Sequence, residues 1–427
     1  MSQSVLDKWF SEDLSTMVFK DRKVLNDNYV PEKFLFREDE MRSIIRNLSR
    51  ALKGDYPSHM VITGPPGTGK THVIKLIQNK FNEKARELGV DAKMIYVCAK
   101  DLSYHKVLVD LANEFGLRIP EKGFDTASIV GKIAEYLKSV EYTNIVVVDD
   151  VDKMIPTVRY PNPIDSLVFK MTRLDEVLNR ISPVCLVLVS NNRLIETPLQ
   201  PYTKSKFMPE RLYFRRYNVE ELVEIYKARV EEAFVSGVVD EDAVNYLSAV
   251  VYREYGSDVR IGLKALLRAG EAIEARKAKV IDARLLSNVL DSIDADLLRD
   301  VVGGLDIVEL LVLYSLLLLK KMGNDEIRTK EMYEAYKFIQ EMARPSAKPK
   351  SMRHVIRLLD KLEIQGFITI DKKSFGRGLG VSLVYSFADD NIEEMYKVVR
   401  EQLKALAQEE LIAERILDEM VMDQLRS

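Results

Sequence analysis

The sequence has very little cysteine and no excess of charge of either sign. Its 427 residues include 2 cysteines, and 63 Lys and Arg against 66 Asp and Glu give a formal net charge of −3. Cys98 and Cys185 both stand inside apolar runs, so we expect core strand positions in a reducing compartment rather than a disulfide. The near balance of charge excludes a uniformly basic protein, and any basic surface has to be local.

Long apolar segments are also missing. The longest run, residues 310–319, is interrupted by Ser315 and is too short to span a bilayer, so we expect a buried helix and no membrane partner. Residues 1–27 are mixed and charged, without an apolar signal region, which favours a cytoplasmic protein. A hydrophobic fraction of 47% in a chain of this length predicts two or three globular domains.

The motif G-x-x-x-x-G-K-[ST] is present at residues 64–71. An apolar strand at residues 59–63 is expected before it and a helix at residues 72–88 after it. In such a loop, backbone N–H groups point at phosphate oxygens, Lys70 reaches the β- and γ-phosphates, and Thr71 holds Mg²⁺. A chance Gly/Pro-rich loop is the alternative, which the flanking strand and helix disfavour. The predicted site for ATP or ADP with Mg²⁺ comprises Gly64, Pro65, Pro66, Gly67, Thr68, Gly69, Lys70 and Thr71.

Two acids follow a second apolar strand, expected at residues 144–148. A bound magnesium ion needs a carboxylate that faces the loop, and Asp149 is placed to supply it through a water molecule. The next carboxylate, Asp150, is expected to orient the attacking water. Taken alone, the pair could equally be an acidic turn after a core strand.

Two further polar residues are predicted to reach the γ-phosphate. Asn191 follows a strand expected at residues 184–189, and an asparagine there can hydrogen-bond the phosphate or the water. Arg260, at the start of a later helix, could reach back to the same phosphate. The alternatives are a turn asparagine, and a helix start capped by Ser257 or Asp258 with the arginine in solvent.

Strands alternate with helices as far as residue 217, which predicts an α/β fold with a parallel sheet. Besides the strand at residues 59–63, the expected strands are residues 93–98, 144–148 and 184–189. The expected helices of this part are residues 38–52, 72–88, 104–115, 129–137 and 163–179. An all-helical region is then expected, with helices at residues 219–234, 240–255, 259–276 and 282–293 and a linker at Gly303-Gly304.

The last third of the chain predicts a winged helix-turn-helix. Three helices are expected at residues 307–320, 329–342 and 351–364, followed by strands at 367–370 and 381–387. The turn between the two strands is expected to span residues 372–380. A long amphipathic helix, roughly residues 392–420, is expected to follow.

This module contains a local excess of positive charge. Residues 344–377 include nine Lys or Arg and three Asp or Glu in a chain that is slightly acidic overall. The third helix of a helix-turn-helix enters the major groove, and a basic hairpin can reach phosphates or a minor groove. A solvated basic face on a protein-binding module is the alternative. The predicted DNA contacts are Lys348, Lys350, Arg353, His354, Arg357, Lys372, Lys373 and Arg377.

These motifs, in this order, resemble those of the AAA+ ATPases. With the winged helix, the chain resembles the archaeal origin recognition complex / cell division control family of replication initiators over roughly residues 19–390. The similar segments are Tyr29-Val30-Pro31 with Arg37, Asp149-Asp150-Val151-Asp152, Ser190-Asn191-Asn192, residues 199–217, Glu220-Glu221-Leu222 and Asp258-Val259-Arg260. The resemblance implies an AAA+ base at residues 1–217, an all-α lid at 218–300 and a winged-helix domain with its C-terminal helix at 301–427.

The resemblance also implies a function. Tyr29, Val30, Pro31 and Arg37 would lie near the adenine. The protein would be nucleoid-associated, recognise double-stranded origin DNA, and help to recruit or load the replicative helicase, with other initiator subunits as further partners. An ATP-regulated transcription factor built from the same modules remains the alternative, and a Holliday-junction motor is a third reading.

Two departures from the family pattern concern the rate of hydrolysis. Asp150 stands where the family has a glutamate, and misplacing a reacting group by about 1 Å can cost on the order of 10²-fold in rate. Tyr202 stands where the family usually has an arginine, and a tyrosine offers no cationic fork to a phosphate. We therefore expect a weak ATPase that acts as a switch rather than a motor.

Overall fold

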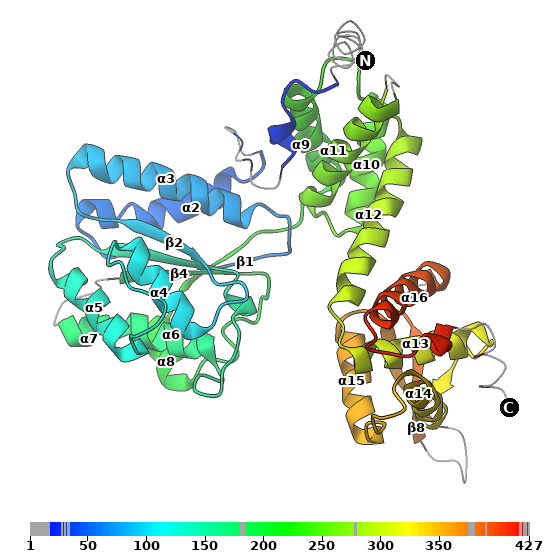
Figure 1. Cartoon of the computed structure of the whole chain (residues 1–427). Helices are drawn as coiled ribbons and strands as arrows, with labels where there is room; N and C mark the ends of the chain where they lie inside the picture. Colours follow the sequence, from blue (N-terminus) through cyan, green and yellow to red (C-terminus); the bar gives the residue numbers. More distant parts are fainter. Residues whose placement is uncertain are drawn as a thin grey trace, which may run out of the picture. The chain divides into compact units, whose positions relative to one another are not determined.

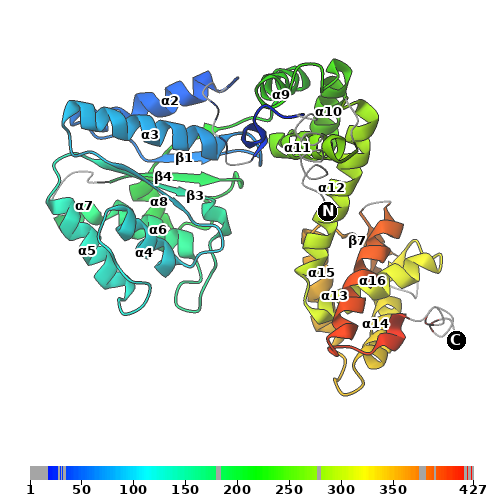
Figure 2. The same ribbon diagram turned by 45° about the horizontal axis from the view of Figure 1, so that its top comes forward.

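The computed structural model describes residues 18–26, 29, 31, 35–178, 184–276, 280–374, 381–388, 391–417, 421 and 425. The chain divides into two compact units, Met1–Ser287 and Asn288–Ser427. The first contains a parallel sheet and a helical bundle, and the second contains the winged helix (Figures 1 and 2). No helix among these residues is long and apolar enough to cross a membrane.

The sheet of the first unit has five strands in the order β2-β3-β4-β1-β5, and every neighbouring pair is parallel. All residues of the three inner strands, β3, β4 and β1, are buried, because helices cover both faces of the sheet. The strands are β1 (Met60–Thr63), β2 (Met94–Cys98), β3 (Asn144–Asp149), β4 (Val184–Ser190) and β5 (Glu210–Tyr213).

Alternate residues of each inner strand point to opposite layers of helices. Val147 and Val187 join the cluster formed with α2 (Glu38–Leu48) and α3 (Lys70–Leu88). Val146 and Leu186 join the cluster on the other face. That second layer contains α4 (Tyr104–Glu114), α5 (Thr126–Lys138), α6 (Pro163–Thr172), α7 (Leu174–Leu178) and α8 (Pro201–Phe207), as Figure 1 shows.

Three details of this unit differ from the sequence predictions. The expected helix at residues 163–179 is two helices, α6 and α7, that break at Arg173, and residue 179 lies outside the described part. The edge strand β5 and helix α8 were not predicted. Cys185 is fully buried as expected, but Cys98 at the end of β2 is exposed, so its assignment to the core was wrong.

The helical bundle follows β5 and starts at a capped helix. Asn218 and Glu221 form a reciprocal capping box that begins α9. The bundle helices are α9 (Val219–Ala233), α10 (Glu241–Glu254), α11 (Val259–Arg276) and α12 (Ala283–Gly303). Helix α12 continues ten residues beyond its predicted end at residue 293, so Gly303 belongs to a helix and not to a linker.

A segment from the start of the chain completes this bundle. Lys20 N–H donates to Ala233 O at 2.7 Å, and the Phe19 ring stacks on Phe234 with centroids 4.8 Å apart. The following 3-10 helix η1 (Arg22–Leu25) buries Val24 and Leu25. Figures 1 and 2 show this dark blue segment against α9 and α11. The bundle is therefore made from two distant parts of the sequence.

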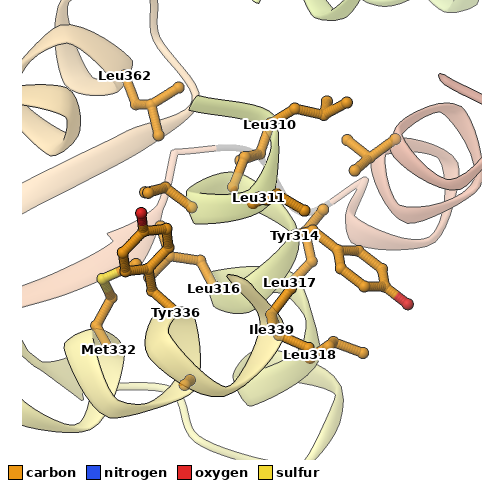
Figure 3. Close-up of a cluster of buried hydrophobic side chains, with 14 of the residues drawn as sticks. Leu310, Leu311, Tyr314, Leu316, Leu317, Leu318, Met332, Tyr336, Ile339 and Leu362 are labelled. Atoms are coloured by element: carbon orange, nitrogen blue, oxygen red, sulfur yellow. The ribbon is translucent and has the colours of Figure 1, made fainter. Parts of the chain in front are cut away.

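The second unit has a helical core around α13 (Ile307–Lys321). Residues 309–319 of this helix are all buried, so it packs on neighbours around its full circumference. Figure 3 shows Leu311, Tyr314 and Leu316 pointing in different directions from this helix. The neighbouring elements are α14 (Thr329–Ala343), α15 (Met352–Ile364), α16 (Ile392–Gln408) and the 3-10 helix η4 (Glu414–Leu417).

An antiparallel sheet of order β6-β8-β7 forms the wing. Its strands are β6 (Ile327–Arg328), β7 (Ile368–Ser374) and β8 (Val381–Phe387), of which the short β6 was not predicted. Because β7 extends to Ser374, Lys372 and Lys373 lie in a strand paired with β8 and not in the turn. The final helix was predicted too long, since α16 ends at Gln408.

Candidate functional site

The phosphate-binding motif connects β1 to α3 at the carboxyl edge of the sheet. Gly67 and Gly69 have φ angles of 70° and 87°, which glycine adopts without strain. A Cβ atom on Gly67 would lie 2.0 Å from Asp258 Oδ1, so no larger residue fits. Helix α3 begins at Lys70, two residues earlier than predicted, and its first N–H groups therefore face the loop.

Lys70 is a buried cation that uses its hydrogen bonds within the site. Its Nζ donates to Gly64 O and Pro65 O, both at 2.7 Å, and to Asn191 Oδ1 at 2.8 Å. Burial lowers the pKa of Lys70 to about 8, and the charge of Arg260 adds to the lowering. These partners are uncharged oxygens, which phosphate oxygens can replace with a gain in charge pairing.

The two predicted magnesium ligands are in direct contact. Asp149, buried at the end of β3, accepts a hydrogen bond from Thr71 Oγ1 at 2.7 Å. The same carboxylate oxygen accepts a hydrogen bond from the Tyr96 hydroxyl at 2.9 Å, and the other accepts one from Asp150 N–H at 2.7 Å. Burial, with the adjacent Asp149 charge, raises the pKa of Tyr96, which therefore stays a hydrogen-bond donor.

Asp150 and Asn191 form the rest of the cluster. Asp150 adopts a left-handed backbone conformation with φ of 49°. Its Oδ1 accepts hydrogen bonds from Lys153 Nζ at 2.8 Å and from Asn191 Nδ2 at 3.2 Å. Asn191 therefore joins Lys70 to Asp150, and the structure brings together four of the five residues predicted to be catalytic.

Arg260, the fifth, lies at the start of α11. Its Nε donates to Asp258 Oδ1 at 2.9 Å, and its side chain is 48% exposed. Asp258 itself lies against Gly67, so the arginine stands beside the phosphate-binding loop. The influence of Arg260 on the pKa of Lys70 agrees with this placement.

The segment expected near the adenine divides between two places. Arg37 is fully buried and binds Thr68 O, at 3.1 Å, through its Nε. Tyr29 lies against α9, because its hydroxyl donates a hydrogen bond to Glu232 Oε2 of that helix at 3.0 Å. Pro31 is half-buried, and Val30 lies outside the described residues.

Four residues of this site were not predicted. Tyr96 and Lys153 contact the two acids directly, and Tyr217 and Ser257 contribute to the hydrogen bonds between loop and bundle. Tyr96 could have been found from its position two residues before the end of β2, which faces α3. The other three carry no signal in a sequence read without its partners.

The donor set fits a nucleotide with a magnesium ion. The loop offers N–H groups and a lysine for phosphates, and Thr71 with Asp149 offers the few oxygens that magnesium takes from protein when phosphates supply others. Among the residues that the structure describes, no group of three His, Cys, Asp or Glu could hold a metal ion by itself. A divalent cation at this site would therefore depend on phosphate oxygens and water.

The predicted nucleic-acid interface lies on α15 and β7. Ser351 caps α15, and Arg353 and Arg357, one turn apart, are both exposed on it, whereas His354 is half-buried. Within the described residues, no ion pair is formed by Lys348, Lys350, Arg353, Arg357 or Lys372.

Two other cations of this module are already paired. Lys373 Nζ lies 2.6 Å from Glu326 Oε1, and Lys361 pairs with the buried Glu309. Arg377, predicted as a DNA contact, lies outside the described residues. The cations available for phosphates therefore concentrate before and along α15.

Family models match three successive parts of the chain. They describe an AAA domain over residues 53–197, a Cdc6 AAA+ ATPase-type lid domain over 223–288 and a CDC6 C-terminal winged helix domain over 300–404. The order of the three agrees with the order of sheet, bundle and winged helix in the structure.

Relatives match along most of their length. ORC1-type DNA replication protein 1 of Aeropyrum pernix is 30% identical over 382 residues, which are 88% of this chain and 95% of the relative. The ORC1-type DNA replication protein of Pyrococcus abyssi is 27% identical over 378 residues, 87% and 88% of the two chains. The solved structure of the Aeropyrum pernix ORC1 protein in complex with DNA is 29% identical, with a TM-score of 0.77 over 91% of this chain and 97% of that one.

Proposed function

This chain belongs to the family of ORC1-type DNA replication proteins, and we propose that it is an ATP-controlled initiator that binds double-stranded origin DNA. In its ATP-bound form it helps to recruit or load the replicative helicase, alone or with other initiator subunits. One observation carries the proposal: a single chain contains both the contact cluster of Lys70, Thr71, Asp149 and Asn191 and a winged helix whose third helix, α15, exposes cations that form no ion pair with any described residue. The solved relative in complex with DNA supports the second half.

The nucleotide is held by residues 64–71, with Lys70 on the β- and γ-phosphates. Thr71 and, through water, Asp149 would hold a magnesium ion, which would offset phosphate charge. Asp150 and Asn191 position the attacking water, and Arg260 contacts the γ-phosphate from the bundle. The contacts among these residues in the structure support the assignment.

Hydrolysis is slow in this proposal, so that the nucleotide acts as a switch. The side chain of Asp150 is one methylene shorter than the glutamate of the family. Its Oδ1 also forms an ion pair with Lys153 Nζ at 2.8 Å. Tyr202, which replaces the family's arginine, is 51% exposed and lies edge-on to Phe169, with centroids 5.3 Å apart. Neither change impairs the loop, so binding is retained while turnover is reduced.

DNA is read by α15 in the major groove, where Arg353 and Arg357 face base edges. Lys348 and Lys350 lie before the helix, and Lys372 lies on β7, positions suited to phosphate contacts. His354, Lys373 and Arg377 complete the proposed DNA contacts. The first five of these cations are exposed and form no ion pair with any residue that the structure describes, which supports these assignments.

Mapping of the protein's chromosomal sites by immunoprecipitation tests the function. An initiator gives one or a few clusters of sites at the positions where newly replicated DNA first accumulates. The same experiment after depletion of ATP should lose helicase from these clusters. Sites spread over promoters, with no enrichment where replication starts, would contradict the proposal.

A further inference from the structure

The bundle and the sheet are joined twice by the chain. Residues 18–25 pack into the bundle, and the chain then reaches α2, which packs on one face of the sheet. It leaves the sheet again after β5 and enters the bundle at Asn218. The first connection ends at Arg37, directly before α2, and the second comprises residues 214–218. Any change in the angle between bundle and sheet must therefore move both.

Arg37 lies at the end of the first connection and forms hydrogen bonds to residues of the second. Its Nη2 donates to Arg215 O at 2.7 Å, and its Nε donates to the Tyr217 hydroxyl at 3.0 Å. The guanidinium also lies over the Tyr217 ring, with Cζ 3.9 Å from the centroid. The two connections are therefore fastened to each other by one side chain.

The same guanidinium holds the phosphate-binding loop. Nε also donates to Thr68 O at 3.1 Å, and the Tyr217 hydroxyl donates to the same oxygen at 3.3 Å. Burying a cation is costly, yet Arg37 is fully buried and has one carboxylate partner, Glu40 at 3.0 Å. Two of its four hydrogen bonds go to backbone oxygens of the loop and the connection, which a residue kept only for charge pairing would not make.

A second set of contacts leads from Tyr217 into the bundle. Tyr217 O accepts a hydrogen bond from the Ser257 hydroxyl at 2.7 Å, and Ser257 is fully buried with φ of 66°. The next residue, Asp258, lies against Gly67 and binds Arg260. Loop, connection and bundle thus form one closed ring of contacts through Arg37 and Tyr217.

We infer that Arg37 is a positioning residue that transmits the occupancy of the loop to the bundle. Nucleotide binding orders the loop around Thr68, and Arg37 with Tyr217 passes this order to both connections and to Asp258 and Arg260. Arg37 acts through its hydrogen bonds to Thr68 and Tyr217. The inference rests on the proposed function, since it requires that the loop binds ATP.

Hydrogen exchange of the full chain, with and without a non-hydrolysable ATP analogue and Mg²⁺, tests the inference. In the unmodified protein, the analogue should slow exchange in residues 64–71 and also in residues 256–262. In Arg37→Lys, compared at analogue concentrations that protect residues 64–71 to the same extent as in the unmodified protein, the bundle response should fall at least about fivefold, the lower range of ordinary coupling between sites. Arg22→Lys is the matched control, because Arg22 pairs with Glu274 inside the bundle and away from the loop.

Tyr217→Phe provides a second variant if Arg37→Lys does not fold. It keeps the ring under the guanidinium and removes the hydroxyl that joins Arg37 to Thr68, so the bundle response should again be lost. A wild-type bundle response in either folded variant would overturn the inference. Failure of the analogue to protect the loop of the unmodified protein would instead overturn the proposed function. If Arg37 had only a structural role, its replacement would weaken the protection of loop and bundle against hydrogen exchange equally.

Discussion

Lys70 is a buried cation whose hydrogen-bond partners are three uncharged oxygens. Burial lowers its pKa to about 8, whereas a bound triphosphate would raise it again by attraction. Between pH 8 and the higher pKa of the bound state, binding must take up a proton. We therefore expect ATP affinity to fall as the pH rises above 8, with little change between pH 7 and 8.

Titration calorimetry in two buffers of different ionisation enthalpy measures this proton uptake. It should be close to zero at pH 7 and should rise towards one proton per site near pH 9. Lys70→Arg is the control, because a guanidinium stays charged over this range and should remove the pH dependence. Equal proton uptake at both pH values in the unmodified protein would disprove the role given to Lys70.

Asp150 provides a second prediction for a single residue. Asp150→Glu lengthens the carboxylate towards the proposed water position, so we expect single-turnover hydrolysis to rise by about tenfold or more. Asp150→Asn, which removes the base, should bind ATP and hydrolyse it more slowly than the unmodified protein. If the glutamate variant is no faster, the short carboxylate does not limit the rate.

The residues of the loop cluster could be predicted from the sequence, whereas the hydrogen-bond partners of Arg37 could not. Lys70, Asp149 and Asn191 come after or at the ends of β1, β3 and β4. The carboxyl ends of parallel strands lie at one edge of the sheet, so these side chains are brought close together. Arg37 was expected beside the adenine. Its partners Thr68, Arg215 and Tyr217 are 31, 178 and 180 residues away, and no local pattern links them.

Among the elements, α15 should contribute recognition of the DNA sequence, and the wing should contribute affinity for DNA of any sequence. Arg353→Ala should weaken binding to origin DNA by about 1–3 kcal/mol and have less effect on bulk DNA, because a base-edge contact is lost. Lys372→Ala on β7 should weaken both alike and reduce the salt dependence of binding by about one phosphate contact. Fluorescence anisotropy at several salt concentrations measures both effects.

Lys397→Ala on α16 is the control for these variants, since it removes a similar exposed charge outside α15 and β7. It should leave binding to both kinds of DNA unchanged. Equal loss on origin and bulk DNA for Arg353→Ala would show a phosphate contact in place of base recognition.

Elements with a strong apolar pattern were predicted well, and weakly patterned ones were missed. Residues 184–189 of β4 are an unbroken apolar run because both faces of the strand are covered. β5 is an edge strand whose residues are mostly exposed, so its sequence has no such run. Gly303 suggested a linker, but Leu298 and Val302 pack in the core of the second unit and keep the helix formed, against a glycine cost of about 1 kcal/mol.

For the whole molecule, the first segment of the chain should decide the stability of the bundle. Deleting residues 1–25 removes Phe19, Val24 and Leu25, each almost fully buried, and should destabilise the bundle by about 5 kcal/mol. Thermal unfolding and limited proteolysis between residues 219 and 276 measure this loss. Deleting residues 1–17 is the control, because it retains every contact just named, and an equal loss there would disprove the assignment.

The two-part bundle also sets an order of events during synthesis. Lys20 bonds to a carbonyl 211 residues later, and Arg22 to a carboxylate 252 residues later. The first segment therefore leaves the ribosome long before its partners exist, while the sheet between them can already fold as a unit. Closing such distant contacts is slow. The ring of contacts through Arg37 and Tyr217 can therefore form only after the bundle has folded. The contacts that couple the loop to the bundle are thus the last part of this unit to fold.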